Sequence, residues 1–302
     1  MPSQAPLLTA DVPWLLYRSY FALPKSIVDA DGNPVNALLG TVNALLNVID
    51  GRRSGDEIRC VVVCMGAEQA DYRVQLYPPY HAHRPPMPPE LAWQWQRAPE
   101  LLQGLGWTYA TSESLEADDV MFSFARTEAQ AGGRALLMTG DRDLYGAVDE
   151  RVAVLELLKG GASAELGPTE VRERYGIEPA QVPDLIALRG DPSDGLPGAP
   201  GVGAKTAAEL LREHGTLEQV LNAAHELENK VARGDGSMRP RIAAALREHD
   251  ELLRKFKQIA TLQEIDVELP PDGATNFASG AACARELGMR RLAERLDQLA
   301  TG

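Results

Sequence analysis

The sequence has little cysteine, no long hydrophobic run and fewer basic than acidic residues. Its three cysteines, Cys60, Cys64 and Cys283, are too few and too scattered for a disulfide scaffold or a zinc cluster. No window approaches the roughly 18 apolar residues that span a bilayer, and the first residues lack the basic region and apolar run of a secretory signal. With 302 residues and 44% hydrophobic content, the composition predicts a globular, cytoplasmic protein.

The net charge of −13 disfavours contact with nucleic acid, because affinity for phosphate backbones comes from Lys and Arg. The placement of the acids weakens this objection. Like charges repel strongly where water is scarce, so acids clustered beside apolar residues indicate a shared cation. Carboxylate oxygens suit hard divalent ions such as Mg²⁺ or Mn²⁺, and neutralising eight acids would reduce the charge to about −5. These eight are Asp11, Glu116, Asp118, Asp119, Asp141, Asp143, Asp191 and Asp194.

Each acidic cluster also has an ordinary structural explanation. Residues 116–119 fall in the first turn of a predicted helix, where the helix dipole favours acids without any ligand. Asp141 and Asp194 lie beside glycine, as common turn residues do. Three clusters of the same chemistry nevertheless favour a cation site.

The N-terminal half alternates between predicted strands and helices. Strands are predicted at 5–11, 57–65, 107–110, 134–139 and 151–157, and helices at 14–23, 36–49 and about 115–131. This alternation predicts an α/β fold with a parallel, doubly wound sheet. Asp11, Asp141 and Asp143 then follow the carboxyl ends of strands, which is the edge where open α/β sheets bind ligands.

Residues 71–100 interrupt this rhythm with a proline-rich stretch. Aromatic residues there alternate with Arg and His, a mixture that suits a single nucleic-acid strand because rings stack on bases and cations meet phosphates. A surface excursion whose rings pack on the domain explains the same residues, and the sequence leaves both interpretations open.

From Thr169 onward the pattern is helical, with no convincing strand before 265–269. The loop at about 190–211 contains Gly198, Gly201, Gly203, Lys205 and Thr206, and it opens an alanine-rich helix. Glycines there can expose backbone N–H groups at a helix N-terminus, which captures a phosphate without reading a base. A basic enrichment between Lys230 and Lys257 is compatible with a nucleic-acid surface or with a solvated helix face.

The order of these motifs resembles the bacterial and phage 5′ nucleases, the flap endonucleases and 5′→3′ exonucleases that also form the N-terminal domain of DNA polymerase I. The likeness covers roughly residues 7–265, through Glu116-Ala-Asp-Asp119, Thr139-Gly-Asp-Arg-Asp143, Gly190-Asp-Pro-Ser-Asp194 and Pro200-Gly-Val-Gly-Ala-Lys-Thr206. It implies a mostly parallel sheet flanked by helices (a PIN-like domain, 1–168) with a helical arch at about 71–100. A helical DNA-binding region (169–302) with a helix-3-turn-helix hairpin is expected to follow, and no polymerase region.

The resemblance also implies roles for individual residues. Two Mg²⁺ or Mn²⁺ ions are expected, one on Asp11, Glu116, Asp118 and Asp119 and the other on Asp141, Asp143, Asp191 and Asp194. His81 and Arg84 are expected to assist catalysis, and a K⁺ ion is expected at the hairpin. DNA contacts are expected from Arg18, Arg73, Tyr80, Arg84, Gly198, Gly201, Gly203, Lys205 and Thr206.

Two positions depart from the family pattern. The family usually has an Asp at the end of the second strand, where this chain reads Cys64-Met65-Gly66, and a Met65 thioether is a poor Mg²⁺ ligand. Weaker metal binding at the first site is therefore expected. His81 stands where relatives commonly carry Lys, and an imidazole is mostly neutral at neutral pH.

The leading hypothesis is a nucleoid-associated, structure-specific nuclease in replication or repair. It would cut DNA at a 5′ flap, fork, nick or gap, with an RNA-containing strand as a further possible substrate. Two other functions remain open on the sequence: a catalytically weakened binder of DNA junctions on the same fold, and a hydrolase of small phosphate esters.

Overall fold

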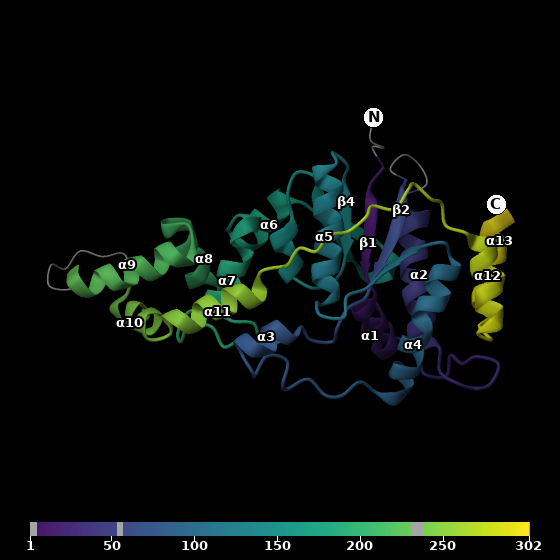
Figure 1. The fold of residues 1–302 in the computed structure, drawn as a ribbon, viewed down its shortest axis with the longest axis horizontal. Coiled ribbons are helices and arrows are strands. Elements are labelled where there is room, and N and C mark those ends of the chain that lie inside the picture. The colour runs from purple at the N-terminus through teal and green to yellow at the C-terminus, as the bar shows by residue number, and fades with distance from the viewer. Residues whose placement is uncertain (1–4, 53–56, 231–237, 302) are drawn as a thin grey trace.

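The computed structural model describes residues 5–52, 57–230 and 238–301. A six-stranded sheet in the order β3-β2-β1-β4-β5-β6 lies at the centre of an elongated molecule (Figure 1). Strands β3, β2, β1, β4 and β5 run parallel to their neighbours, and β6 pairs antiparallel with β5. The strands are β1 (Leu7–Asp11), β2 (Cys60–Cys64), β3 (Thr108–Ala110), β4 (Ala135–Met138), β5 (Val152–Leu157) and β6 (Ser163–Leu166). The predicted mostly parallel sheet is confirmed, while β6 was not predicted.

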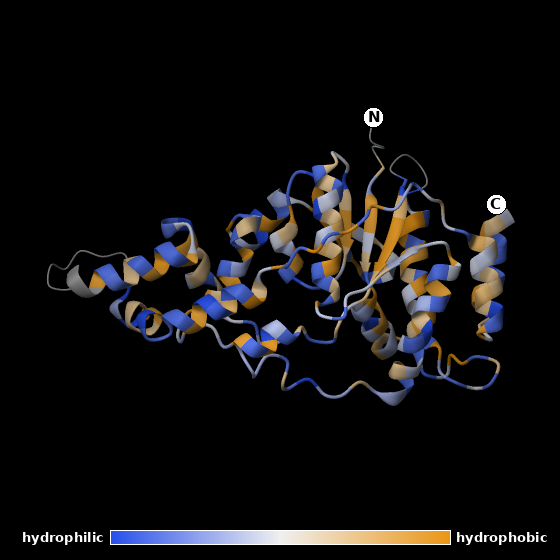
Figure 2. Ribbon diagram, viewed as in Figure 1, coloured by the Kyte–Doolittle hydropathy of each residue, from blue (hydrophilic) through white to orange (hydrophobic). Residues whose placement is uncertain are grey.

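The central strands are buried on both faces, as their continuous apolar sequence requires. Alternate residues point into two separate cores. Leu7, Val62 and Leu137 pack on the side of α5 (Ala117–Gln130), whereas Leu8, Val63 and Leu136 pack on the side of α1 (Val12–Ala22). Figure 2 shows the strands as the most hydrophobic part of the molecule, between helices whose outer faces are hydrophilic.

Helices cover both faces of the sheet, so the doubly wound arrangement is observed. One face carries α1 (Val12–Ala22), α2 (Asn36–Asp50), α4 (Pro89–Gly104), α12 (Phe277–Glu286) and α13 (Arg290–Thr301), and the other carries α5 (Ala117–Gln130). In the described part of the chain, no helix has the length and apolar character that crossing a membrane requires.

The helical region projects from one end of the sheet (Figure 1). It contains α6 (Pro168–Tyr175), the 3-10 turn η3 (Pro179–Gln181), α7 (Val182–Arg189), α8 (Ala204–His214), α9 (Leu217–Lys230), α10 (Pro240–Glu248) and α11 (Asp250–Ala260). Two further 3-10 turns connect strands of the sheet: η1 (Asp143–Ala147) follows β4, and η2 (Lys159–Gly161) joins β5 to β6. After α11 the chain returns across α5 in an extended segment, residues 261–276, and ends in α12 and α13 against α4. The segment at 265–269 that the sequence left as the next possible strand has no regular sheet structure.

The proline-rich stretch joins two helices. It begins with α3 (Asp71–Leu76), continues as an irregular connection through residues 77–88, and ends where Pro89 starts α4. The connection runs below the carboxyl edge of the sheet (Figure 1). The expected arch is therefore an ordered crossing between α3 and α4, placed beside the acids.

Candidate active site

A cavity of about 810 Å³ opens at the carboxyl edge of the parallel sheet, and acids from five separate segments line it. Asp11 is the last residue of β1, while Asp141 and Asp143 follow the end of β4. Parallel strands place these ends at one edge, where the start of α5 also lies. The lining acids are Asp11, Glu68, Glu116, Asp118, Asp141, Asp143 and Asp194, of which the sequence analysis did not single out Glu68.

The acids in this cavity repel one another. Burial, followed by repulsion from Asp141 and Asp11, raises the pKa of Asp118 well above its ordinary value. Burial and then Asp141 and Asp194 do the same to the pKa of Asp143. Burial raises the pKa of Asp11 to about 6, although it accepts hydrogen bonds from the Trp14 backbone N–H and the Thr139 hydroxyl. A nearby cation would relieve this cost, because it stabilises the ionised form of each acid.

Asp191 lies in an adjoining cavity of about 490 Å³, which shares Asp141 and Trp14 with the first. Its carboxylate accepts hydrogen bonds from the backbone N–H and hydroxyl of Ser193. Arg189 lies 3.6 Å from the other carboxylate oxygen. The structure therefore brings seven of the eight predicted acids to one connected region.

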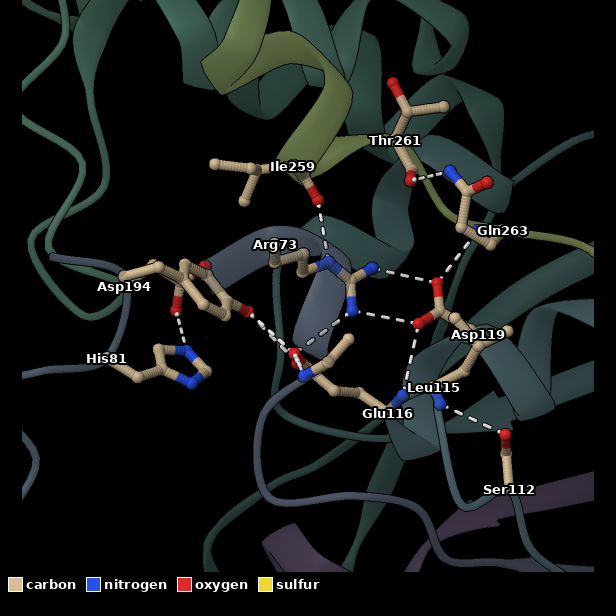
Figure 3. Close-up of polar contacts among 12 residues, drawn as sticks. Arg73, His81, Ser112, Leu115, Glu116, Asp119, Asp194, Ile259, Thr261 and Gln263 are labelled. Carbon is tan, nitrogen blue, oxygen red and sulfur yellow. Dashed lines mark hydrogen bonds and ion pairs between the residues drawn. The ribbon is translucent and has the colours of Figure 1, made fainter. Parts of the chain in front are cut away.

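The eighth acid, Asp119, is placed differently. It is fully buried and is absent from the lining of either cavity. Its two carboxylate oxygens accept hydrogen bonds from Arg73, at 2.8 and 2.9 Å (Figure 3). The expectation that Asp119 faces the cation with the other acids is not met, because its charge is already balanced by Arg73.

Arg73 is also buried. It was expected to contact a DNA strand, yet its side chain is 5% exposed. Besides Asp119, the guanidinium donates to the Ile259 carbonyl and lies 3.2 Å from the Glu116 carboxylate. These contacts engage all three guanidinium nitrogens within the fold, although Arg73 also lines the main cavity, and its contact with a DNA strand stays a prediction.

Residues of the arch connection hold two of the cavity acids. The Tyr80 hydroxyl lies 3.0 and 3.1 Å from the two carboxylate oxygens of Glu116. One Asp194 oxygen lies 3.0 Å from His81 Nε2 and accepts a hydrogen bond from Arg84 at 3.1 Å. Tyr80 and His81 are buried, whereas the Arg84 side chain is about half exposed. All three line the cavity, and Arg84 is the most exposed of them.

The donors fit hard divalent ions in kind, since they are carboxylates crowded against one another. In the conformation of the described residues, no group of three or more His, Cys, Asp or Glu side chains forms a complete metal site. Arg73, Tyr80, His81 and Arg84 occupy some of the oxygens instead. To bind an ion through these oxygens, some of the four side chains that now contact them must rotate away.

Met65 lies outside the cavity. Asp11 pairs in register with Cys64, so the next residue, Met65, points to the opposite face of the sheet and is buried in the core beside α1. Gly66 has no room for a side chain, because an added Cβ would lie 2.5 Å from the backbone of Glu116 and Ala117. The sequence still lacks the Asp that the family usually has at the end of the second strand. An Asp at position 65 would not restore a carboxylate to the cavity, because this side chain points into the core.

The hairpin glycines divide into two kinds. Gly201 and Gly203 are exposed, with nothing within 4 Å of an added Cβ, and Gly203 precedes α8. Lys205 is exposed in the first turn of that helix. These features match the predicted phosphate site, which also includes the half-buried Thr206. Gly198 departs from it: it is buried, and an added Cβ would lie 2.3 Å from the Gly190 backbone nitrogen.

One wall of the main cavity is aromatic, which the sequence analysis missed. Trp14, Tyr17 and Phe21 of α1 line it together with Trp95 of α4, and Phe21 is 72% exposed. Arg18 is exposed on the same helix, with its guanidinium 5.6 Å from the centre of the Trp14 ring. The spacing of 14, 17 and 21 along a helix was the available signal, since it places three rings on one face.

The basic enrichment near α10 and α11 does not form one free surface. Arg254 pairs with Glu218, and Lys257 lies 2.6 Å from Asp184. Arg239, Arg241 and Lys255 are exposed, whereas Arg233 lies outside the described residues.

Two family models cover most of the chain. The 5′-3′ exonuclease N-terminal resolvase-like domain matches residues 6–176, and the 5′-3′ exonuclease C-terminal SAM fold matches residues 177–277. The chain belongs to the 5′-3′ exonuclease family. A 5′-3′ exonuclease of Mycobacterium tuberculosis is 35% identical to this family member over 98% of the chain and 99% of its own length. A 5′-3′ exonuclease of Streptomyces coelicolor is 36% identical, over 95% and 97% respectively.

DNA polymerase I of Mycobacterium tuberculosis is 35% identical over 81% of this chain but only 26% of its own length. Among solved structures, the T5 D15 protein co-crystallised with metal ions has a TM-score of 0.66 at 15% identity, covering 98% of this chain and 99% of that one. The catalytic core of Rad2 in complex with DNA substrate has a TM-score of 0.64 at 14% identity, covering 97% and 93%. These structures confirm the fold. The family and its full-length relatives identify the chain as a nuclease, a hydrolase of phosphodiester bonds.

Proposed function

We propose that this 5′-3′ exonuclease family member is a structure-specific 5′ nuclease that cuts DNA with the help of two divalent cations. The observation that carries the proposal is the cavity itself, where seven carboxylates from five segments meet at the carboxyl edge of the sheet. A junction binder without chemistry, or a small-ester hydrolase, is less well supported. The first does not require the clustered acids, and the second leaves the matched C-terminal fold unexplained.

The acids divide into two candidate sets for the ions. Asp11, Glu116 and Asp118 are proposed for one ion, and Asp141, Asp143, Asp191 and Asp194 for the other; all of them line the two adjoining cavities. When bound, such ions clamp the scissile phosphate, lower the pKa of an attacking water and stabilise the leaving oxygen. Mg²⁺ and Mn²⁺ both suit carboxylate oxygens, and we propose them as alternatives.

The remaining residues of the cavity suit a single strand. Arg84 supplies positive charge at the rim, while Trp14, Tyr17, Phe21 and Trp95 offer rings on which bases stack. The exposed start of α8 supplies backbone N–H groups for a phosphate of the duplex, where we also propose a K⁺ ion. A 5′ flap, fork, nick or gap presents a duplex beside a strand end, and therefore fits both surfaces.

The test is cleavage of labelled flap, fork, nick and gap duplexes, with DNA or RNA in the strand that ends, in Mg²⁺ or Mn²⁺. We expect 5′-phosphate products from the parent and from Asp266→Asn, a matched control because Asp266 is exposed on the returning segment. Asp141→Asn should be inactive while still binding the duplex. Binding without cleavage by the parent in either metal would instead support the junction binder.

A further inference from the structure

The carboxylate of Asp119 is saturated by donors from its own chain. Besides the two bonds from Arg73, it accepts from the Gln263 backbone N–H at 2.8 Å and from the Glu116 backbone N–H at 3.2 Å. An ionised carboxylate offers about four lone-pair sites. Four donors therefore leave no oxygen position for a metal ion.

These donors come from three different parts of the chain (Figure 3). Arg73 belongs to α3 at the base of the arch, Gln263 to the extended segment after α11, and Glu116 is the N-cap of α5. Glu116 and Asp119 also form a reciprocal capping box, which fixes the first turn of the helix. One buried carboxylate thus joins the arch, the helical region and the segment that carries the cavity acids.

Two further contacts strengthen the same junction. Arg73 Nε donates to the Ile259 carbonyl at the end of α11, at 3.0 Å. One turn along α5, the Ser123 hydroxyl accepts a hydrogen bond from the Ile265 backbone N–H and donates to the Asp119 carbonyl. The start of α5 is therefore fixed to the returning segment at two successive turns.

We propose that Asp119 is a positioning residue and not a metal ligand. It holds Glu116 and Asp118 at the cavity wall and couples their placement to the arch and to the helical region. This inference rests on the proposed function, because it concerns how the acids of that site are placed. Losing Asp119 would disturb the geometry of the ions without removing one of their ligands.

The test counts bound Mn²⁺ directly, by electron paramagnetic resonance titration of the parent, Asp119→Asn and Asp118→Asn without DNA. We expect Asp119→Asn to saturate at the same number of ions as the parent, with affinity weakened by tenfold or less, and Asp118→Asn to lose an ion or bind it at least 100-fold more weakly. Flap cleavage by Asp119→Asn should fall 10- to 100-fold in kcat, the usual range for residues that orient ligands. Loss of one Mn²⁺ from Asp119→Asn, at an unchanged melting temperature, would overturn the proposal.

A double variant separates pairing from ligation. Arg73→Gln alone leaves the buried Asp119 charge unbalanced, so it should lower the melting temperature more than Arg73→Gln with Asp119→Asn does. If Asp119 were a ligand, the second substitution would instead deepen the defect in Mn²⁺ binding. The Mn²⁺ counts and the melting temperatures do not depend on cleavage. If the parent did not cleave DNA, the proposed function would be overturned, and these two measurements would still decide the role of Asp119.

Discussion

The two acid groups nearest the sheet, the start of α5 and the loop after β4, carry similar charge but are stabilised differently. At the start of α5, Arg73 balances Asp119, and Tyr80 donates to Glu116. In the loop after β4, the Asp141 carboxylate accepts one backbone hydrogen bond, from Asp143. The Asp143 carboxylate accepts none from any described residue, and burial, followed by repulsion from Asp141 and Asp194, raises its pKa. Asp119 and Glu116 are therefore held by the fold, whereas Asp118 resembles Asp143, because burial and repulsion raise the pKa of both carboxyls. We expect an external cation to stabilise Asp118 and the acids of the second group.

The largest expected effect is the loss of activity when Asp143, in the loop after β4, loses its charge. Asp143→Asn should lower kcat by roughly three orders of magnitude, about 4 kcal/mol, because it removes a proposed ligand. In EDTA the same variant should melt at a higher temperature than the parent. An acid whose folded pKa lies above its ordinary value costs stability once the pH exceeds that ordinary value, and Asn removes this cost. Single-turnover cleavage and calorimetry at pH 7 measure both effects, with Asp266→Asn as the control; a lower melting temperature would contradict this account of the loop.

The next effect concerns Met65, the residue that follows β2. Met65→Asp should lower the free energy of unfolding by about 3–5 kcal/mol, since it buries an unbalanced charge in the core beside α1. Met65→Leu should cost less than about 1.5 kcal/mol because it keeps the volume. Urea unfolding gives both values. Normal stability of Met65→Asp together with tighter Mn²⁺ binding would show that this side chain reaches the cavity after all.

The third effect concerns the hairpin glycines, which follow Asp191 and Asp194 in the same loop. Gly198 has φ of +66° and no room for a Cβ beside Gly190, whereas Gly201 has φ of +81° and open space. Gly198→Ala should therefore destabilise the protein by roughly 2–4 kcal/mol, and Gly201→Ala by only about 1 kcal/mol. Thermal unfolding of the two variants is the measurement, and equal losses would mean that close packing at Gly198 is unimportant.

The smallest effect tests support for the start of α5. Tyr80→Phe removes the hydroxyl that donates to Glu116, which should cost about 1 kcal/mol of stability and reduce cleavage by less than about tenfold. Tyr77→Phe is the matched control, because Tyr77 is a partly buried tyrosine of the same segment that packs edge-on against Phe256. A loss of cleavage as large as that of Asp143→Asn would indicate that Tyr80 acts on the substrate directly.

Much of the fold was predictable because its signals are local. Continuous apolar runs such as Cys60–Cys64 specify buried parallel strands, and the acids after β1 and β4 then fall at one edge. β6 was missed because Ser163–Leu166 is a short edge strand with one buried residue, and so lacks a hydrophobic pattern. The extended segment after α11 was not predictable either, since it is held by side chains distant in sequence, such as Ser123.

The site was predictable by residue type but not by orientation. Asp118 and Asp119 are adjacent on a helix and chemically equivalent in the sequence, yet one faces the cavity and the other faces Arg73. The ordinary explanation of acids in a first helical turn therefore applies to Asp119, through its capping box. The direction of the Met65 side chain follows from the alternation of side chains along β2. Successive residues point to opposite faces of the sheet, so a shift of one position reverses the face.

The most direct test of the shared cation site is anomalous diffraction from crystals soaked in Mn²⁺. The account predicts two peaks in the cavity, one within coordination distance of Asp118 and the other of Asp143, with Asp119 still on Arg73. A cavity without a peak, or a Mn²⁺ ion coordinated by Asp119, would contradict it.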